Sequence, residues 1–100
     1  MIKYLKDEDF YEETKEGIVL VDFYADWCGP CQRMGEILEK MDDVKILKVN
    51  TDDFNELALS FGVMSIPTLI LFKDGNTVGK LIGLHSKEDL NDFIRKAEEE

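Results

Sequence analysis

The chain has 100 residues, a length that supports one domain (1–100) with a single core, and 44% of its residues are hydrophobic. The formal net charge of −10, with 12 Lys and Arg scattered among 22 Asp and Glu, argues against a nucleic-acid partner, because phosphate binding needs clustered basic side chains. Neither a membrane span nor a signal peptide is predicted, since Asp22 interrupts the apolar run 18–25 and residues 1–7 hold no apolar segment. We therefore expect a cytoplasmic protein without a membrane partner.

The first half of the chain alternates strand and helix patterns. Residues 2–5 are a short strand candidate, and residues 7–15 indicate a helix with acids in its first turn, closed by Gly17. Residues 18–25 are mostly apolar and β-branched, which is typical of a buried strand. Residues 32–41 carry apolar side chains on one stripe, which predicts a second helix.

The second half adds three strands and two helices. Residues 44–49 indicate a strand, and residues 52–62 a short helix that ends at its glycine. Residues 68–72 and 77–82 are two strands, joined by an Asp-Gly hairpin loop. Ser86 begins the last helix, which buries Leu90, Phe93, Ile94 and Ala97. The order β-α-β-α-β-α-β-β-α predicts an α/β fold, with a parallel core extended by an antiparallel hairpin and helices on both faces.

Both cysteines of the chain lie between the buried strand and the second helix, in the run Trp27-Cys28-Gly29-Pro30-Cys31. The free N–H groups at the start of a helix favour a thiolate at Cys28. Reduction of a disulfide needs such an attacking thiolate and a second thiol that expels the substrate from the mixed disulfide. Cys28 and Cys31 supply both, so the pattern predicts redox chemistry with Cys28 as nucleophile and Cys31 as resolving thiol.

A series of short motifs accompanies the cysteine pair along nearly the whole chain. They are Asp22 six residues before Cys28, Lys48-Val49-Asn50-Thr51-Asp52, Gly62-Val63, Ile66-Pro67-Thr68, Phe72-Lys73-Asp74-Gly75 and Gly83. Together with the cysteine motif, this set resembles the thioredoxin family. The resemblance implies a thioredoxin fold and a general protein-disulfide reductase, whose only redox group is the Cys28–Cys31 disulfide. It also implies disulfide-containing client proteins, a thioredoxin reductase of the NADPH-flavin or ferredoxin type, and a monomer.

The resemblance further implies roles for single residues. Asp22 corresponds to the buried acid that takes the proton of Cys31 through water, and Lys48 to the lysine that reaches this acid. Burial raises the pKa of a carboxyl group toward the range of a general base. Ile66-Pro67 corresponds to a cis peptide bond that faces the cysteines and pairs with an extended substrate segment. The expected substrate-binding residues are Trp27, Gly29, Pro30, Met64, Ser65, Ile66, Pro67 and Gly83, with Gly62, Val63 and Leu84 completing an apolar rim.

Alternatives stay open on the residues alone. A structural staple between Cys28 and Cys31 is disfavoured because so short a ring removes little loop entropy. A closed zinc site needs four donors, whereas the chain offers two cysteines and a distant His85, expected in a surface loop. Two further alternatives concern single residues: Asp22 could face outward instead of being a buried base, and Trp27 could pack in the core instead of binding substrate. A disulfide oxidase or isomerase, and an assembly scaffold without turnover, are the competing functions.

Three features depart from the family pattern. Glu36 stands where a kink proline is usual, Tyr24 stands where a second tryptophan is common, and the link after Met41 is short. Because residues 32–41 contain Gly35 but no proline, the sequence predicts a straight helix or a mild bend at that glycine.

Overall fold

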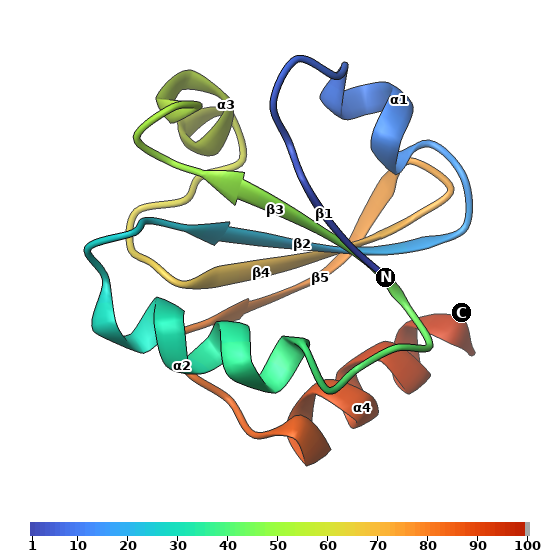
Figure 1. The fold of residues 1–100 in the computed structure, drawn as a ribbon. Helices are drawn as coiled ribbons and strands as arrows, with labels where there is room; N and C mark the ends of the chain where they lie inside the picture. The colour runs from blue at the N-terminus through green and yellow to red at the C-terminus, as the bar shows by residue number, and fades with distance from the viewer. Residues whose placement is uncertain (100) are drawn as a thin grey trace.

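The computed structural model describes residues 1–99, which form a five-stranded sheet between two layers of helices (Figure 1). The elements are β1 (Ile2–Tyr4), α1 (Phe10–Thr14), β2 (Ile18–Tyr24), α2 (Gly29–Leu38), β3 (Lys45–Asn50), α3 (Asn55–Ser60), β4 (Thr68–Lys73), β5 (Asn76–Ile82) and α4 (Lys87–Glu98). This order confirms the predicted α/β class. Within the described residues, no helix has the length and apolar character needed to cross a membrane.

The sheet has the strand order β1-β3-β2-β4-β5. Strands β1, β3 and β2 are parallel, whereas β4 runs antiparallel to β2 and β5 antiparallel to β4. The β4–β5 hairpin turns at Asp74 and Gly75, both with positive φ (51° and 87°), which an Asp-Gly pair adopts readily. The predicted parallel core with an antiparallel hairpin is therefore confirmed.

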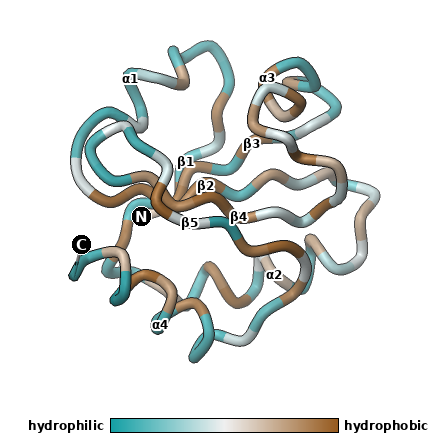
Figure 2. Tube along the Cα trace, turned by 180° about the vertical axis from the view of Figure 1, so that it is seen from behind, coloured by the Kyte–Doolittle hydropathy of each residue, from teal (hydrophilic) through white to brown (hydrophobic). Residues whose placement is uncertain are grey.

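Side chains from both faces of the sheet are buried. On one face, β2 and β3 pack with Phe10 of α1 and Ala58 of α3, and on the other with Met34 of α2 and Leu90 of α4. Figure 1 shows these helix pairs on opposite sides of the sheet, and Figure 2 shows hydrophobic residues concentrated along the central strands. Burial of both faces explains why β2 is nearly continuous in apolar residues, and makes its single acid, Asp22, exceptional.

Helix α2 begins and ends three residues earlier than predicted: we expected 32–41 and find Gly29–Leu38. Cys28 is the N-cap residue, and Pro30 lies in the first turn, where an N–H has no helical partner to lose. The helix continues through Gly35 without interruption. Met41 lies in the following loop and is still buried. Its apolar side chain therefore indicated a buried position correctly, but not a helical one.

The other helices also differ from the sequence prediction at their ends. Helix α1 is shorter than the predicted 7–15, because Asp9 acts as N-cap and its carboxylate accepts a hydrogen bond from the N–H of Tyr11. Helix α3 begins at Asn55, after a turn that includes the two predicted starting acids. The start of α4 is confirmed, since the Ser86 hydroxyl accepts a hydrogen bond from the N–H of Asp89 at 3.1 Å.

We predict that Gly79→Ala destabilises the packing of α4 on β5. A Cβ at position 79 would stand 2.5 Å from Cε1 of Phe93, so the ring has to move. Overpacking of this kind lowers the free energy of unfolding by about 1–3 kcal/mol. Gly29→Ala is the matched control, because a Cβ there meets no atom within 4 Å. Urea unfolding of both variants measures the effect, and equal midpoints would contradict the prediction.

Candidate active site

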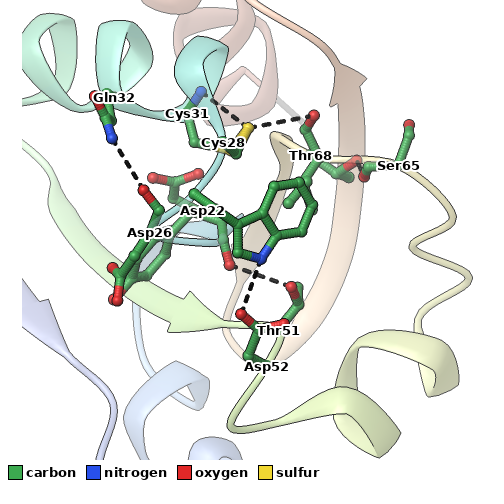
Figure 3. Close-up of a disulfide and its surroundings, with 12 residues drawn as sticks. Asp22, Asp26, Cys28, Cys31, Gln32, Thr51, Asp52, Ser65 and Thr68 are labelled. Carbon is green, nitrogen blue, oxygen red and sulfur yellow. Dashed lines mark hydrogen bonds between the residues drawn. A yellow bond between two sulfur atoms is a disulfide. The ribbon is translucent and has the colours of Figure 1, made fainter.

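The two cysteines lie at the start of α2 and are joined by a disulfide (Figure 3). The Sγ atom of Cys28 accepts a hydrogen bond from the backbone N–H of Cys31, with an N···S distance of 3.2 Å. This N–H belongs to the first turn of the helix and has no backbone acceptor there. In the reduced protein, the same N–H and the positive end of the helix dipole stabilise a thiolate on Cys28.

The two cysteines differ in position more than in exposure. Cys28 is 5% exposed and Cys31 is 2% exposed. Cys28 caps the helix from outside, and its Sγ lies 3.8 Å from the carbonyl oxygen of Ile66, whereas Cys31 is enclosed in the first helical turn. Cys31 is thus shielded as predicted, and only Cys28 receives the capping N–H.

Asp22 of β2 is fully buried, at 0% exposure, and lies opposite Lys48 of β3 in the parallel register. The Nζ atom of Lys48 is 3.3 Å from Oδ2 of Asp22, but this ion pair lacks hydrogen-bond geometry. Neither carboxylate oxygen accepts a hydrogen bond from residues 1–99. Burial therefore outweighs the attraction of the lysine and raises the pKa of Asp22 to about 6. A carboxyl group with this pKa exchanges its proton near neutral pH.

A cleft of about 400 Å³ opens on the side of α2 that faces β1 and β3. Its walls include Tyr4, Tyr24, Gly35 and Lys48, together with Cys31. Because Lys48 both lines the cleft and contacts Asp22, the cleft brings solvent to the boundary of the buried carboxylate. The cleft therefore connects Cys31 and the Lys48 end of the ion pair to solvent.

The peptide bond between Ile66 and Pro67 is cis, as the resemblance implied. The carbonyl oxygen of Pro67 accepts a hydrogen bond from the N–H of Gly83 at 2.8 Å, and Gly83 has a φ of 87°, which favours glycine. The carbonyl oxygen of Ser65 accepts one from the hydroxyl of Thr68 (Figure 3). These two hydrogen bonds, at Ser65 and at Pro67, fix the backbone on both sides of Ile66, whose carbonyl oxygen lies beside Cys28.

A second cleft, of about 550 Å³, lies between Trp27, α3 and the segment that precedes Pro67. It is lined in part by Trp27, Met64, Ser65 and Ile66. Trp27 is 71% exposed and Met64 86% exposed, which excludes the core alternative for the tryptophan. Gly29 and Pro30 are exposed as well. Val63 lines this cleft as well, but it is 6% exposed and packs on the core, so it contributes little to the exposed rim.

Some functional contacts were not anticipated. The indole N–H of Trp27 donates a hydrogen bond to Oδ2 of Asp52 at 3.0 Å, and this acid fixes the exposed ring. Tyr4 and Tyr24 both lie beside the Lys48 ammonium. Asp52 could have been found from topology, because it follows β3, whose carboxyl end lies at the same sheet edge as that of the parallel β2.

His85 lies in the loop before α4, as expected for a surface residue. Its Nδ1 is 3.7 Å from Oδ2 of Asp89, and its Nε2 is 3.1 Å from the carbonyl oxygen of Ile82. Among residues 1–99, no three His, Cys, Asp or Glu side chains gather in a way that could hold a metal ion.

Comparison with known proteins gives one consistent match. The family model described as Thioredoxin matches residues 1–96. Thioredoxin from Listeria monocytogenes is 46% identical over 101 residues, covering 96% of this chain and 98% of its own, and thioredoxin from Bacillus subtilis is 44% identical, covering 90% and 91%. A solved mutant thioredoxin from Halobacterium salinarum NRC-1 has a TM-score of 0.87 at 35% identity, covering 95% of this chain and 88% of that chain. Thioredoxin from Malassezia sympodialis has a TM-score of 0.82 at 28% identity, covering 96% and 90%.

We predict that Asp22→Ala stabilises the protein at neutral pH. The folded-state pKa of Asp22, about 6, lies above its ordinary value of 3.8, so the folded state binds the proton more tightly and wild-type stability falls as pH rises through this window. Asp22→Ala has no carboxyl group at this position, so its stability does not fall in this pH window. Its free energy of unfolding should exceed that of the wild type by about 1–3 kcal/mol at pH 7, with Lys48 left unpaired offsetting part of the gain.

Denaturant unfolding between about pH 3 and pH 8 measures this difference. The gain should grow from about pH 4 to pH 6 and be constant above. Asp22→Asn, which also lacks the titrating group but keeps the shape, is the matched control and should follow the same pH dependence. A gain that shrinks with rising pH would show that the Lys48 ion pair dominates and that the carboxylate stabilises the fold.

Proposed function

This chain belongs to the thioredoxin family and is a protein-disulfide reductase acting by dithiol–disulfide exchange, and on this premise we propose that Cys28 attacks the client and Cys31 resolves the mixed disulfide. The hydrogen bond from the N–H of Cys31 to Sγ of Cys28 carries this assignment. It stabilises negative charge on Cys28 and leaves Cys31 without equivalent help.

The reaction transfers two electrons in two exchange steps. The Cys28 thiolate attacks one sulfur of the client disulfide, the client S–S bond breaks, and the other client sulfur leaves as a thiolate that takes a proton from solvent. Cys31 then loses its proton and attacks Sγ of Cys28. The bond between Cys28 and the client breaks, the second client sulfur leaves as a thiolate, and the Cys28–Cys31 disulfide remains.

Asp22 acts as the base of the second step, in our proposal, and Lys48 modulates it. With a pKa of about 6, the Asp22 carboxyl group is mostly ionised at pH 7 and takes the proton of Cys31 through water in the neighbouring cleft. The Lys48 ammonium, 3.3 Å away, keeps the carboxylate from binding the proton too tightly. The support for this role is the absence of any hydrogen bond to the carboxylate from residues 1–99.

Client binding uses the segment around the cis bond and the exposed rim beside it. An extended client segment pairs with the backbone of Ile66 next to Pro67, a mode that recognises backbone and so suits many sequences. The contact surface is formed by Trp27, Gly29, Pro30, Met64, Ser65 and Gly83. The exposure of Trp27 and Met64 on the cleft that Ile66 also lines supports this surface.

The remaining features of the function follow from the family and the chain length. Proteins of this family act on disulfide substrates, are reduced by a thioredoxin reductase and need no cofactor beyond their own disulfide. We propose that residues 1–100 form a single domain and that the protein is a monomer in the cytoplasm. Its electrons come from an NADPH-dependent flavin enzyme or a ferredoxin-dependent one. Reduction assays with each reductase type distinguish the two electron sources.

The roles of the two cysteines predict an asymmetry between their serine variants. Cys28→Ser should abolish reduction of a model disulfide protein, because no attacking thiolate remains. Cys31→Ser should still attack and accumulate a stable mixed disulfide with the client, since nothing expels it. Non-reducing electrophoresis and mass spectrometry measure the trapped adduct. Adducts on the Cys28→Ser variant alone would reverse the assignment.

The role of Asp22 predicts a selective kinetic defect. Asp22→Asn should slow resolution of the mixed disulfide at pH 7 by about 10²–10⁴-fold, the usual contribution of a general base, while the first attack by Cys28 changes little. Single-turnover quenched-flow measurements separate the two steps. Resolution at the wild-type rate would show that Asp22 is only a structural partner of Lys48.

A further inference from the structure

The ammonium group of Lys48 is held by aromatic rings as well as by Asp22. Its Nζ atom lies 4.5 Å from the ring centroid of Tyr24 and 5.6 Å from that of Tyr4, while it is 3.3 Å from Oδ2 of Asp22. The two rings contact each other edge to face, with centroids 6.1 Å apart. Both distances to Nζ are within the range in which a cation is attracted to the face of a ring.

Helix α2 closes the remaining side of this enclosure. A Cβ at Gly35 would stand 3.3 Å from Nζ of Lys48, so a side chain at this position of α2 would crowd the ammonium. Lys48 is buried, with β1, β2 and α2 around its charged end. The ammonium therefore has a defined place beside the carboxylate.

We propose that Tyr24, supported by Tyr4, is a positioning residue of the resolving step: its ring holds the Lys48 ammonium against Asp22 and so sets how readily the carboxylate accepts the Cys31 proton. This inference rests on the proposed role of Asp22 as base. Asp22 remains the base and Lys48 its counter-charge in this proposal. Tyr24 is given no contact with the client, and because its ring also packs against the cluster of Ala25, Cys28 and Cys31, the test below measures the Asp22 titration in the disulfide form, where Cys31 does not titrate.

The Lys48 ammonium can be attracted by the Tyr24 ring beside Asp22 or by other acids of the cleft. The neutral ring attracts the ammonium, and Tyr24 stays neutral because burial, and then the Asp26 carboxylate, raise the pKa of its phenol. Without the ring, the Lys48 side chain is free to turn toward the acids that line the cleft, which are Asp26, Glu36 and Glu39. Asp22 would then lose its counter-charge and bind a proton more tightly.

Other titratable or charged groups lie around the ion pair, and their own titration could change that of Asp22. They are Tyr4 from β1, Asp26 after β2, Cys31 and Glu36 from α2, and Glu39, the C-cap residue of that helix. On β4 the residue opposite Asp22 is the apolar Leu69. A titration of the disulfide form removes Cys31 from this set.

The test follows protonation of Asp22 by carbon-13 NMR of the side-chain carboxyl in the disulfide form. Tyr24→Leu should strengthen proton binding to Asp22 by a factor of about 2–5, the scale of a cation–π contact. Tyr24→Phe, which keeps the ring and loses only the hydroxyl, should restore the wild-type titration. An unchanged Asp22 titration in Tyr24→Leu overturns the proposal.

A double-mutant cycle separates positioning from a change in solvation. In a Lys48→Gln background there is no ammonium to hold, so Tyr24→Leu should leave the Asp22 titration unaltered. A shift of equal size in that background means that the ring acts by excluding water, which overturns the proposal. If Tyr24→Leu does not fold, Tyr4→Leu carries the same test, with a smaller shift in the same direction because its ring is farther from Nζ.

The consequence for catalysis is read from the pH profile of mixed-disulfide resolution. In Tyr24→Leu the midpoint of this profile should rise together with the Asp22 titration, and in Tyr24→Phe it should return. If the Asp22 titration moves and the profile does not, Asp22 is not the base of resolution; that outcome refutes the proposed mechanism and the link to resolution. An unmoved titration refutes only the positioning role of Tyr24.

Discussion

The parallel pairing of β2 with β3 is the constraint on which the whole site depends. Its register places Asp22 opposite Lys48, so that a buried carboxylate always has one cation beside it. The same pairing brings the carboxyl ends of both strands to one edge of the sheet. The loop with the cysteines follows β2 there, and Asp52, which binds the indole of Trp27, follows β3. One backbone arrangement thus positions both the Asp22–Lys48 ion pair and the indole of Trp27.

In the proposed mechanism, burial of Asp22 serves chemistry at the expense of stability. A fully hydrogen-bonded carboxylate in this place would have a low pKa and would be a poor base at neutral pH. Asp22 instead has an ion pair without hydrogen-bond geometry, and burial raises its pKa to about 6. The fold tolerates this group because apolar packing on both faces of the sheet stabilises the strand that carries it.

Two departures from the family pattern acquire a structural meaning around Lys48. Tyr24 stands where a tryptophan is common in the family, and in this chain it presents an aromatic face to the ammonium. Glu36, in place of the usual proline, leaves α2 continuous and lines the cleft that opens beside Lys48. Both residues lie on the solvent side of the ion pair, where the cleft reaches it.

The sequence by itself determined the order and type of every element, the cysteine pair at a helix start, and Asp22 as the odd residue in a buried strand. These features are local, because periodicity, caps and turn residues act over a few positions. Only the tertiary structure decided that Asp22 lacks hydrogen bonds, that Val63 turns inward while Trp27 stays exposed, and that Tyr4, Tyr24 and Gly35 surround Lys48. These features depend on strand register and on how closely α2 approaches the sheet, and contacts between distant segments leave no local pattern in the chain.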